Sequence, residues 1–88
     1  MTITAVRIHP EDNVICLLAN HQEGEEPVLA GMKGPALTAP VPMGHKIALS
    51  DIAKGEPVIK YGAVIGHATQ AIAPGDHVHL HNLVGAPP

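Results

Sequence analysis

Nine glycines and nine prolines are spread along the 88 residues of this chain, so every apolar run is interrupted after a few positions. Both residue types exceed their average usage, and runs this short suit strands separated by turns. The apolar residues point the same way. Because the chain has one Tyr and no Phe or Trp, aliphatic side chains must fill the core, and the β-branched ones favour strands. We therefore predict an ordered all-β domain.

Short apolar or alternating runs mark the expected strands. These strands cover residues 4–10, 13–19, 45–49, 57–62, 64–72 and 77–83. Residues 29–44 are too rich in glycine and proline for a helix, so we expect short strands and a loop there. One helical turn is expected near residues 50–55. We expect a single domain over residues 1–88, with its core at 6–83 and a frayed tail at 84–88.

The charge pattern excludes several classes of function. The net charge is −3, and the sequence has neither a basic stripe nor a ladder of aromatic residues, which are the features of a nucleic-acid-binding protein. No apolar run approaches the length of a membrane span, and the N-terminus lacks a signal segment. The single cysteine, Cys16, fits a small buried side chain better than a reactive thiol. We expect a cytoplasmic protein that binds neither nucleic acid nor membranes.

One pattern occurs three times, at residues 41–47, 52–58 and 72–78. It consists of an aliphatic residue, a small residue or Pro, any residue, Gly, two polar-leaning positions and a second aliphatic residue. This pattern predicts a tight turn whose glycine takes a positive φ before the next strand begins. The segments are either three ordinary turns or three turns of one shape. In the second case, the polar pairs 45–46 and 76–77 would be exposed at matching places around one cleft.

Three histidines alternate near the C-terminus, at His77, His79 and His81. On a strand they would share one face, about 6.6 Å apart. Two imidazoles at this spacing can bind one divalent metal, such as zinc, iron, nickel or copper. Three other residues could supply a third ligand: His45, His67 and Asp76. The other interpretation is that the three alternating histidines are solvated strand residues.

Other catalytic patterns are weaker in this sequence. It has no Ser or Cys in a nucleophile motif, and its glycines are isolated rather than arranged to hold a phosphate. His45 and Lys46 form the one base-like pair whose place after a turn glycine indicates a purpose. Because so small a core can hardly enclose a catalytic pocket, we expect a partner to supply the rest of any active site.

Residues 43–83 resemble the small N-terminal SAF domain of the altronate and galactarate dehydratases and of the related sulfolactate sulfo-lyases. The matching elements are Gly44-His45-Lys46-Ile47-Ala48-Leu49, Asp51-Ile52, Gly55, Val58, Lys60-Tyr61-Gly62, Ile65-Gly66 and Val78-His79 with His81-Asn82. The opening segment at 9–14, His-Pro-Glu-Asp-Asn-Val, also fits, so the match covers roughly residues 6–83. Each piece is short, and the combination is what makes the resemblance specific.

The resemblance implies a β-clip fold and association with a much larger catalytic domain or subunit. The enzymes of this family remove water or sulfite from hydroxy carboxylates, and the dehydratases depend on a metal, with iron implicated. The resemblance makes His45 the candidate proton carrier and Lys46 a second catalytic residue that binds the substrate carboxylate. His79 and His81 become candidate metal ligands, and Asn82 a candidate substrate-binding residue. The same C-terminal motif could instead form the interface with the large partner.

Three hypotheses about function follow. The first is a small, non-autonomous subunit of a sugar-acid dehydratase, or of a sulfolactate sulfo-lyase, that works with a large catalytic subunit. Because the sequence ends at residue 88 with no catalytic domain after it, we expect a separately encoded small subunit, and the alternative is a piece of a longer enzyme. The second is a free-standing SAF module that binds a carbohydrate or carboxylate without turnover. The third is a metal-binding accessory protein.

Overall fold

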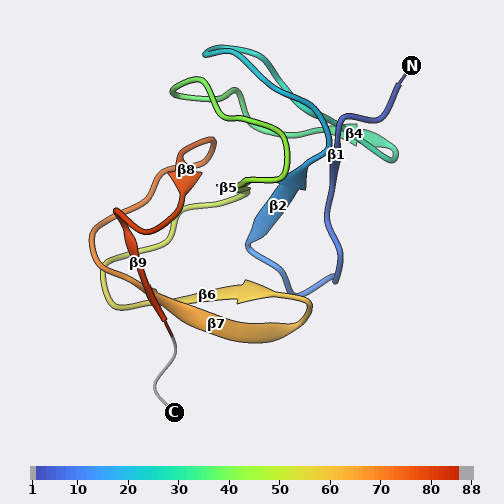
Figure 1. Ribbon diagram of the computed structural model, residues 1–88. Helices are drawn as coiled ribbons and strands as arrows, with labels where there is room; N and C mark the ends of the chain where they lie inside the picture. Colours follow the sequence, from blue (N-terminus) through green and yellow to red (C-terminus); the bar gives the residue numbers. More distant parts are fainter. Residues whose placement is uncertain (1, 86–88) are drawn as a thin grey trace.

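The computed structural model describes residues 2–85 and shows an all-β fold, as the sequence predicts (Figure 1). The strands are β1 (Ala5–Val6), β2 (Val14–Leu17), β3 (Val28–Leu29), β4 (Met32–Lys33), β5 (Lys46–Ala48), β6 (Pro57–Lys60), β7 (Ala63–Ala68), β8 (His77–Val78) and β9 (Leu83–Gly85). They form three antiparallel sheets with the orders β1-β2-β5-β8, β3-β4 and β6-β7-β9. None of the residues 2–85 is helical, so this part of the chain has no helix that could cross a membrane.

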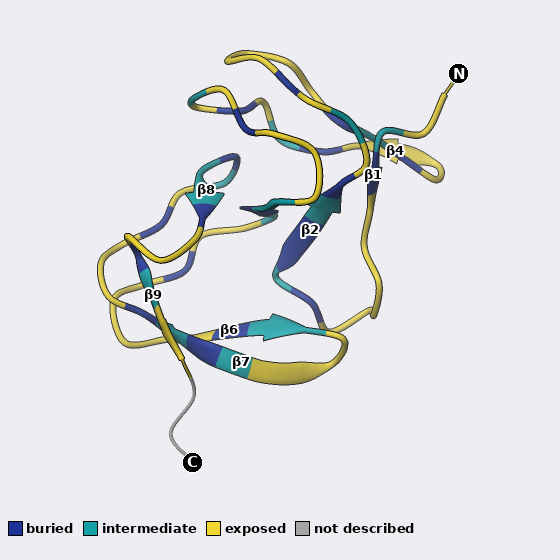
Figure 2. Cartoon of the chain, viewed as in Figure 1, coloured by how far each residue is buried: buried dark blue, intermediate teal, exposed yellow. Residues whose placement is uncertain are grey.

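The core consists of two aliphatic clusters, and β2 contributes to both. Val14 belongs to one cluster, whereas Ile15 and Leu17 belong to the other. Strand β5 divides in the same way, with Ile47 in one cluster and Ala48 in the other. Because successive side chains of a strand point to opposite faces, the β2–β5 pair is covered on both sides. This explains the continuous apolar run of β2, which is buried along most of its length (Figure 2).

The three repeated segments form turns of one shape. Gly44, Gly55 and Gly75 have φ values of +88°, +87° and +88°. In each turn, the backbone N–H after the glycine donates to the carbonyl oxygen three residues earlier, as in a type II turn. A fourth turn with the same hydrogen bond contains Gly24 at φ +85°, and the sequence analysis missed it. Its first residue is the buried His21, where the other three segments have an aliphatic side chain.

These four turns meet in two pairs. His21, at the start of the Gly24 turn, forms an antiparallel bridge with Val41, at the start of the Gly44 turn. Ile52, at the start of the Gly55 turn, forms the same kind of bridge with Ile72, at the start of the Gly75 turn. The helical turn expected near residues 50–55 is therefore wrong. The burial of Ile52 in this bridge and the positive φ of Gly55 hold that segment in a turn.

The strand predicted over residues 77–83 is also wrong, because the chain turns between two short strands there. Strand β8 ends at Val78, and the N–H of Asn82 donates to the carbonyl oxygen of His79 at 3.1 Å. Strand β9 then pairs with β7 and continues to Gly85, two residues into the segment that we expected to be a frayed tail. The remainder of that expected tail, residues 86–88, lies outside the described residues.

Candidate functional site

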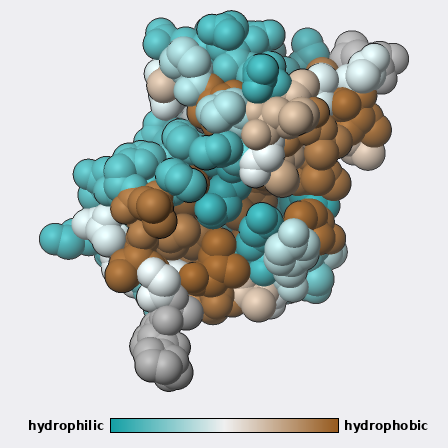
Figure 3. Space-filling view, viewed as in Figure 1, coloured by the Kyte–Doolittle hydropathy of each residue, from teal (hydrophilic) through white to brown (hydrophobic). Residues whose placement is uncertain are grey.

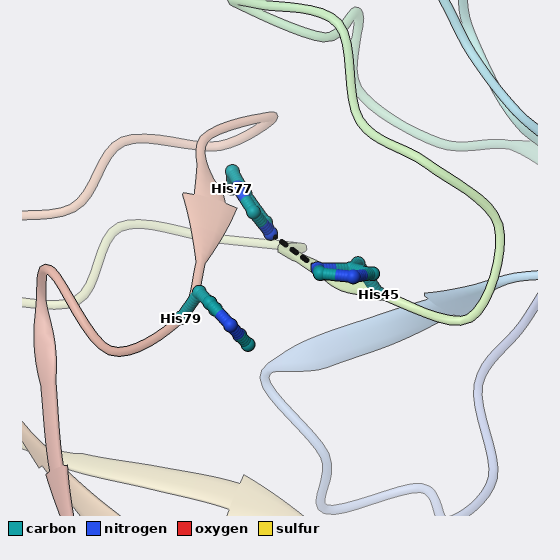
Figure 4. A group of neighbouring side chains, drawn as sticks. All are labelled: His45, His77 and His79. Atoms are coloured by element: carbon teal, nitrogen blue, oxygen red, sulfur yellow. Dashed lines mark hydrogen bonds between the residues drawn. The ribbon is translucent and has the colours of Figure 1, made fainter.

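Three imidazole rings lie together beside strands β5 and β8 (Figure 4). His45 and His77 are half-buried and His79 is exposed, and one ring nitrogen of each lies within 4.8 Å of the others. Nδ1 of His45 is 2.9 Å from Nε2 of His77, which is a hydrogen-bonding distance. The rings of His77 and His79 are stacked, with centroids 5.3 Å apart and an interplanar angle of 8°. Within residues 2–85, these three side chains form the group of His, Cys, Asp or Glu residues whose ligand atoms lie close enough together to hold a metal ion.

Sheet register brings this group together. Strand β5 pairs antiparallel with β8, so Ile47 lies opposite His77 and Lys46 lies opposite Val78. His45, which immediately precedes β5, therefore lies beside the end of β8, where His79 follows. The expectation that both polar pairs surround one cleft holds only in part. His45 and His77 meet, but they stand one and two residues after their turn glycines, and Asp76, which matches His45, instead bonds Thr38 and Ala73.

His45 occupies a position that an acidic residue occupies in the other three turns. In those turns the carboxylates of Glu25, Glu56 and Asp76 accept hydrogen bonds from the backbone N–H three residues earlier. In the turn of His45 the residue three positions earlier is Pro42, which has no N–H to donate. A carboxylate at position 45 would have no such bond to make, so this position is free for a side chain with another role.

Asn82 is buried, and its side chain holds the backbone of two histidines of the cluster. Its Oδ1 accepts a hydrogen bond from the His79 N–H at 2.9 Å, and its Nδ2 donates to the His77 carbonyl oxygen at 2.8 Å. These bonds use one acceptor and one donor of the amide to fix the backbone of two histidines. The structure thus gives Asn82 a positioning role, whereas the predicted binding of substrate by this residue stays a prediction.

The other predicted ligands lie outside the group of three rings. His81 is exposed, with its ring centroid 5.6 Å from that of His77. Asp76 accepts hydrogen bonds from the Ala73 N–H and, at 2.7 Å, from the Thr38 hydroxyl. His67 lies in β7, opposite residues of β6 and β9. The assignment of a metal to His79 and His81 stays a prediction. The geometry groups His79 with His45 and His77.

A small cavity of about 130 Å³ adjoins the cluster. It is lined by Gly44, His45, Lys46, Lys60 and His79. Desolvation of the half-buried Lys46 ammonium lowers its pKa, and the nearby Lys60 lowers it further, against a smaller opposing effect of Cys16. Burial likewise lowers the pKa of His77, and so do its imidazole neighbours. Both effects favour a neutral His77, which is the form of histidine that binds a metal.

A larger cavity of about 420 Å³ lies at the β3–β4 hairpin, which forms a separate sheet, and it shares no lining residue with the histidine cavity. Its lining is mainly apolar and includes Ile3, Val28, Leu29 and Met32. The apolar surface over this hairpin and the N-terminal segment is visible at the upper right of Figure 3. Lys33 is its one ionisable side chain among the described residues. This cavity therefore lacks the converging polar groups of a reactive site.

The three imidazoles fit a divalent metal. Two nitrogens bound tetrahedrally to one ion at about 2.0–2.1 Å would lie about 3.3 Å apart. His45 Nδ1 and His77 Nε2 are 2.9 Å apart, which is a hydrogen-bonding distance, so the two rings would separate by a few tenths of an ångström around such an ion. Neutral imidazole suits zinc, copper, iron and nickel. The ring of His79 lies close enough to be a third ligand of such an ion.

The fold and the site define a small all-β domain that presents a histidine cluster and two lysines at an open cavity. A family model described as the altronate/galactarate dehydratase SAF domain matches residues 3–86, and the chain belongs to this family. This confirms the resemblance inferred from the sequence.

Among similar proteins, altronate dehydratase from Escherichia coli (strain K12) is 51% identical over 77 residues, which are 88% of this chain and 15% of that protein. The galactarate dehydratase (L-threo-forming) of the same organism is 34% identical, over 94% of this chain and 16% of its own length. The (2R)-sulfolactate sulfo-lyase subunit alpha of Chromohalobacter salexigens is 51% identical over 43 residues, 49% of this chain and 46% of that subunit. The chain thus spans a small part of the dehydratases that it matches.

Sequence analysis included His77 among the three alternating histidines that could bind a metal, but the family resemblance then singled out His79 and His81. One residue of the cavity, Lys60, was given no role. Lys60 has no local feature that separates it from a surface lysine. Its place at the cavity depends on how β6 packs beside β2, which the family motif at residues 60–62 indicates only indirectly.

Proposed function

We propose that this chain is the small, non-autonomous component of a hydroxy-acid lyase and supplies part of an active site that a large catalytic component completes. The observation that carries the proposal is the cluster of His45, His77 and His79 beside Lys46 at one open cavity. The family membership and the dehydratase relatives indicate the reaction type, which is loss of water from a hydroxy carboxylate. The cytoplasm is the compartment that we propose for it.

The size of the cavity supports the need for a partner. At about 130 Å³ it is well below the roughly 300–1,000 Å³ of ligand-binding pockets. Three exposed apolar side chains are sequence neighbours of its lining residues, namely Met43 beside Gly44, Tyr61 beside Lys60 and Leu80 beside His79. Leu80 is 84% exposed. Apolar residues around a polar cavity are typical of a surface that another protein component covers.

His45 is the proton carrier in this proposal, and Lys46 binds the substrate carboxylate. The hydrogen bond with His77 uses Nδ1 of His45 and orients its ring, so Nε2 is the nitrogen available to exchange a proton with substrate. Dehydration requires removal of the proton next to the carboxylate and departure of the hydroxyl group on the following carbon as water. The resulting enol becomes a 2-oxo acid. The ammonium group of Lys46 stabilises the negative charge that develops on the carboxylate side of the substrate.

A divalent metal, with iron as the family's candidate, is the cofactor that we propose for the same cluster, shared with the large component. When bound, it would supply a Lewis acid that stabilises negative charge on substrate oxygens. His79 is the ligand common to the sequence prediction and the geometry, and His45 and His77 are placed to join it. A His45 that binds metal cannot also carry the proton, so metal analysis of His45 variants decides between these two roles.

The test is co-purification of the tagged chain with its large partner, followed by assays on altronate, galactarate and (2R)-sulfolactate. We expect 2-oxo acid or sulfite to form only when both components are present. Lys46→Gln should reduce kcat/KM at least about tenfold, whereas Lys33→Gln on the exposed strand β4 should leave it unchanged. A chain that retains no partner and supports no turnover would overturn the proposal.

A sulfo-lyase role is the second candidate, and one observation favours it. The relative from Chromohalobacter salexigens is itself a subunit alpha, and this chain covers nearly half of it. The same assay separates the two candidates, because sulfite release from sulfolactate and water loss from a sugar acid give different products. A free-standing binding module would instead bind one of these acids, and no partner would confer turnover on it.

A further inference from the structure

Lys60 reaches the histidine cavity from a sheet separate from the one that carries the histidines. Strand β6 belongs to the β6-β7-β9 sheet, whereas Lys46 lies on β5 of the four-stranded sheet. Both lysines are half-buried and both line the cavity. The five described residues of this lining include no acidic side chain. Two ammonium groups are therefore held at one small cavity without a carboxylate in its wall to neutralise them.

Two residues that precede β2 hold Lys60 in this position. Oδ1 of Asn13 accepts a hydrogen bond from the Ile59 N–H at 2.8 Å, which fixes β6 beside β2. The buried carboxylate of Asp12 accepts hydrogen bonds from Tyr61 N–H at 3.1 Å and from Gly62 N–H at 2.8 Å. These bonds anchor the turn directly after Lys60 to the central sheet, so the position of Lys60 is set by the tertiary structure on both sides.

The turn itself contains the one strained non-glycine residue among residues 2–85. Tyr61 and Gly62 join β6 to β7 with φ values of +58° and +71°. A two-residue hairpin of this kind favours Asn, Asp or Gly at its first position, and a tyrosine there is unfavourable. Tyr61 is 63% exposed, and its ring centroid lies 5.0 Å from Nζ of Lys60. A cation–π contact of this length orients the ammonium group.

We infer that Lys46 and Lys60 form a two-cation binding site for the carboxylate of a polyhydroxy acid, with Lys60 as a substrate-binding residue oriented by Tyr61. The inference rests on the proposed function for the identity of the ligand. The two lysines of the cavity indicate that the ligand is negatively charged. A carboxylate between two ammonium groups gains two charge-assisted hydrogen bonds, and the adjacent imidazole of His45 then faces the carbon atoms next to that carboxylate. A single lysine would fix neither the orientation of such a substrate nor its position along the cavity.

The test titrates the isolated chain with galactarate. Binding is measured by NMR of the ¹⁵N-labelled protein at constant ionic strength. Galactitol, which has the same carbon chain and hydroxyl groups but no carboxylates, is the matched ligand control. We expect galactarate to shift the amide signals around residues 44–46 and 60–62, and galactitol to leave them unchanged. Lys60→Gln should weaken the binding about five- to tenfold, as expected for one partly exposed charged hydrogen bond. Lys54→Gln, at an exposed turn position, should change it less than twofold.

Failure of this inference can be told apart from failure of the proposed function. If galactarate shifts no signal near Lys46 and Lys60, or shifts them equally in Lys60→Gln, the two-lysine site is wrong, whatever activity the assembled enzyme has. Equal shifts with galactitol would also overturn it. If Lys60→Gln loses galactarate binding while no partner restores turnover, the anion site stands and the lyase assignment fails. In an active assembly, we expect Lys60→Gln to raise KM. Lys60→Arg should bring KM part of the way back toward the wild-type value.

Discussion

Nδ1 of His45 lies 2.9 Å from Nε2 of His77, although the two residues are 32 positions apart in the sequence. Each follows a turn whose glycine has a φ of +88°, and the pairing of β5 with β8 brings the two turns together. His79 joins them because its ring stacks on that of His77. The three rings share one small volume, so the loss of any one alters the surroundings of the other two.

The first prediction concerns metal binding by this group. His77→Ala and His79→Ala should each weaken the binding of Zn²⁺ or anaerobic Fe²⁺ at least about tenfold, because each removes one of three ligands. Isothermal titration of the chain with either metal measures this effect. His81→Ala is the matched control, since His81 is a neighbour that lies outside the group. If His81→Ala weakens binding as much as His79→Ala, the ligand pair predicted from the sequence is correct and the grouping with His45 is wrong.

The second prediction concerns Asn82. Asn82→Ala should lower the free energy of unfolding by about 1–3 kcal/mol, because the backbone groups of His77 and His79 lose buried partners. In a domain of this size, each kcal/mol corresponds to about 4–8 °C in Tm. Thermal unfolding followed by circular dichroism measures the shift. A variant with unchanged Tm but lower affinity for a hydroxy acid would instead assign Asn82 to substrate binding.

The third prediction concerns the pH dependence of stability through Asp12. Burial acts to raise the pKa of this carboxyl group, but the N–H groups of Gly62, Tyr61 and His9 together lower it below its ordinary value. Because the folded-state pKa is lower than the unfolded value of about 3.9, Asp12 contributes stability above that pH, and the contribution is lost as the pH falls through the folded-state pKa. The stability difference between wild type and Asp12→Asn should therefore be largest above about pH 5 and shrink toward pH 2–3.

Urea denaturation at pH 7, 5 and 3 measures this difference. At pH 7 we expect Asp12→Asn to cost about 1–3 kcal/mol, since a charged acceptor of buried hydrogen bonds is replaced by a neutral one. Asp51→Asn is the control, because Asp51 is exposed. A difference between wild type and Asp12→Asn that stays constant from pH 7 to pH 3 would show that the lowered pKa of Asp12 does not stabilise the fold.

The fourth prediction compares two turn glycines with nearly the same φ. A Cβ atom at Gly75 would lie 2.0 Å from the carbonyl oxygen of Ala36, whereas a Cβ atom at Gly55 would meet nothing within 4 Å. Gly55→Ala should cost about 1 kcal/mol for the positive φ alone. Gly75→Ala should cost at least about 3 kcal/mol, because the backbone must also move. Equal losses in chemical denaturation would mean that the close approach of residues 36 and 75 is relaxed in solution.

The fifth prediction concerns the strained turn. Tyr61→Asn should raise the free energy of unfolding by about 0.5–1 kcal/mol, because Asn tolerates positive φ better than Tyr. The same change removes the ring that lies against the Lys60 ammonium. We therefore expect higher stability together with weaker galactarate binding, measured by urea denaturation and NMR titration. If the variant is more stable and binds galactarate as tightly as the wild type does, Tyr61 takes no part in the binding site.

Much of the fold could be predicted from local patterns. The repeated glycine segments predict the three turns because a positive φ is a property of one residue and its immediate neighbours. The turn at Gly24 escaped because a buried histidine, His21, stands where an aliphatic residue was expected. The strand over 77–83 was wrong for a related reason. Alternation alone cannot show that the Asn82 side chain binds the backbone at His77 and His79 and turns the chain.

The sequence by itself determined the all-β class, the turns at Gly44, Gly55 and Gly75, and the membership in the SAF domain family, because these depend on residue types at fixed local spacing. Only the tertiary structure decided that His45 meets His77 and that Lys60 reaches their cavity. Both relationships depend on strand pairing and on hydrogen bonds between residues far apart in the chain, such as Asn13 with Ile59. No local sequence pattern determines how strands that are joined through long loops align with one another.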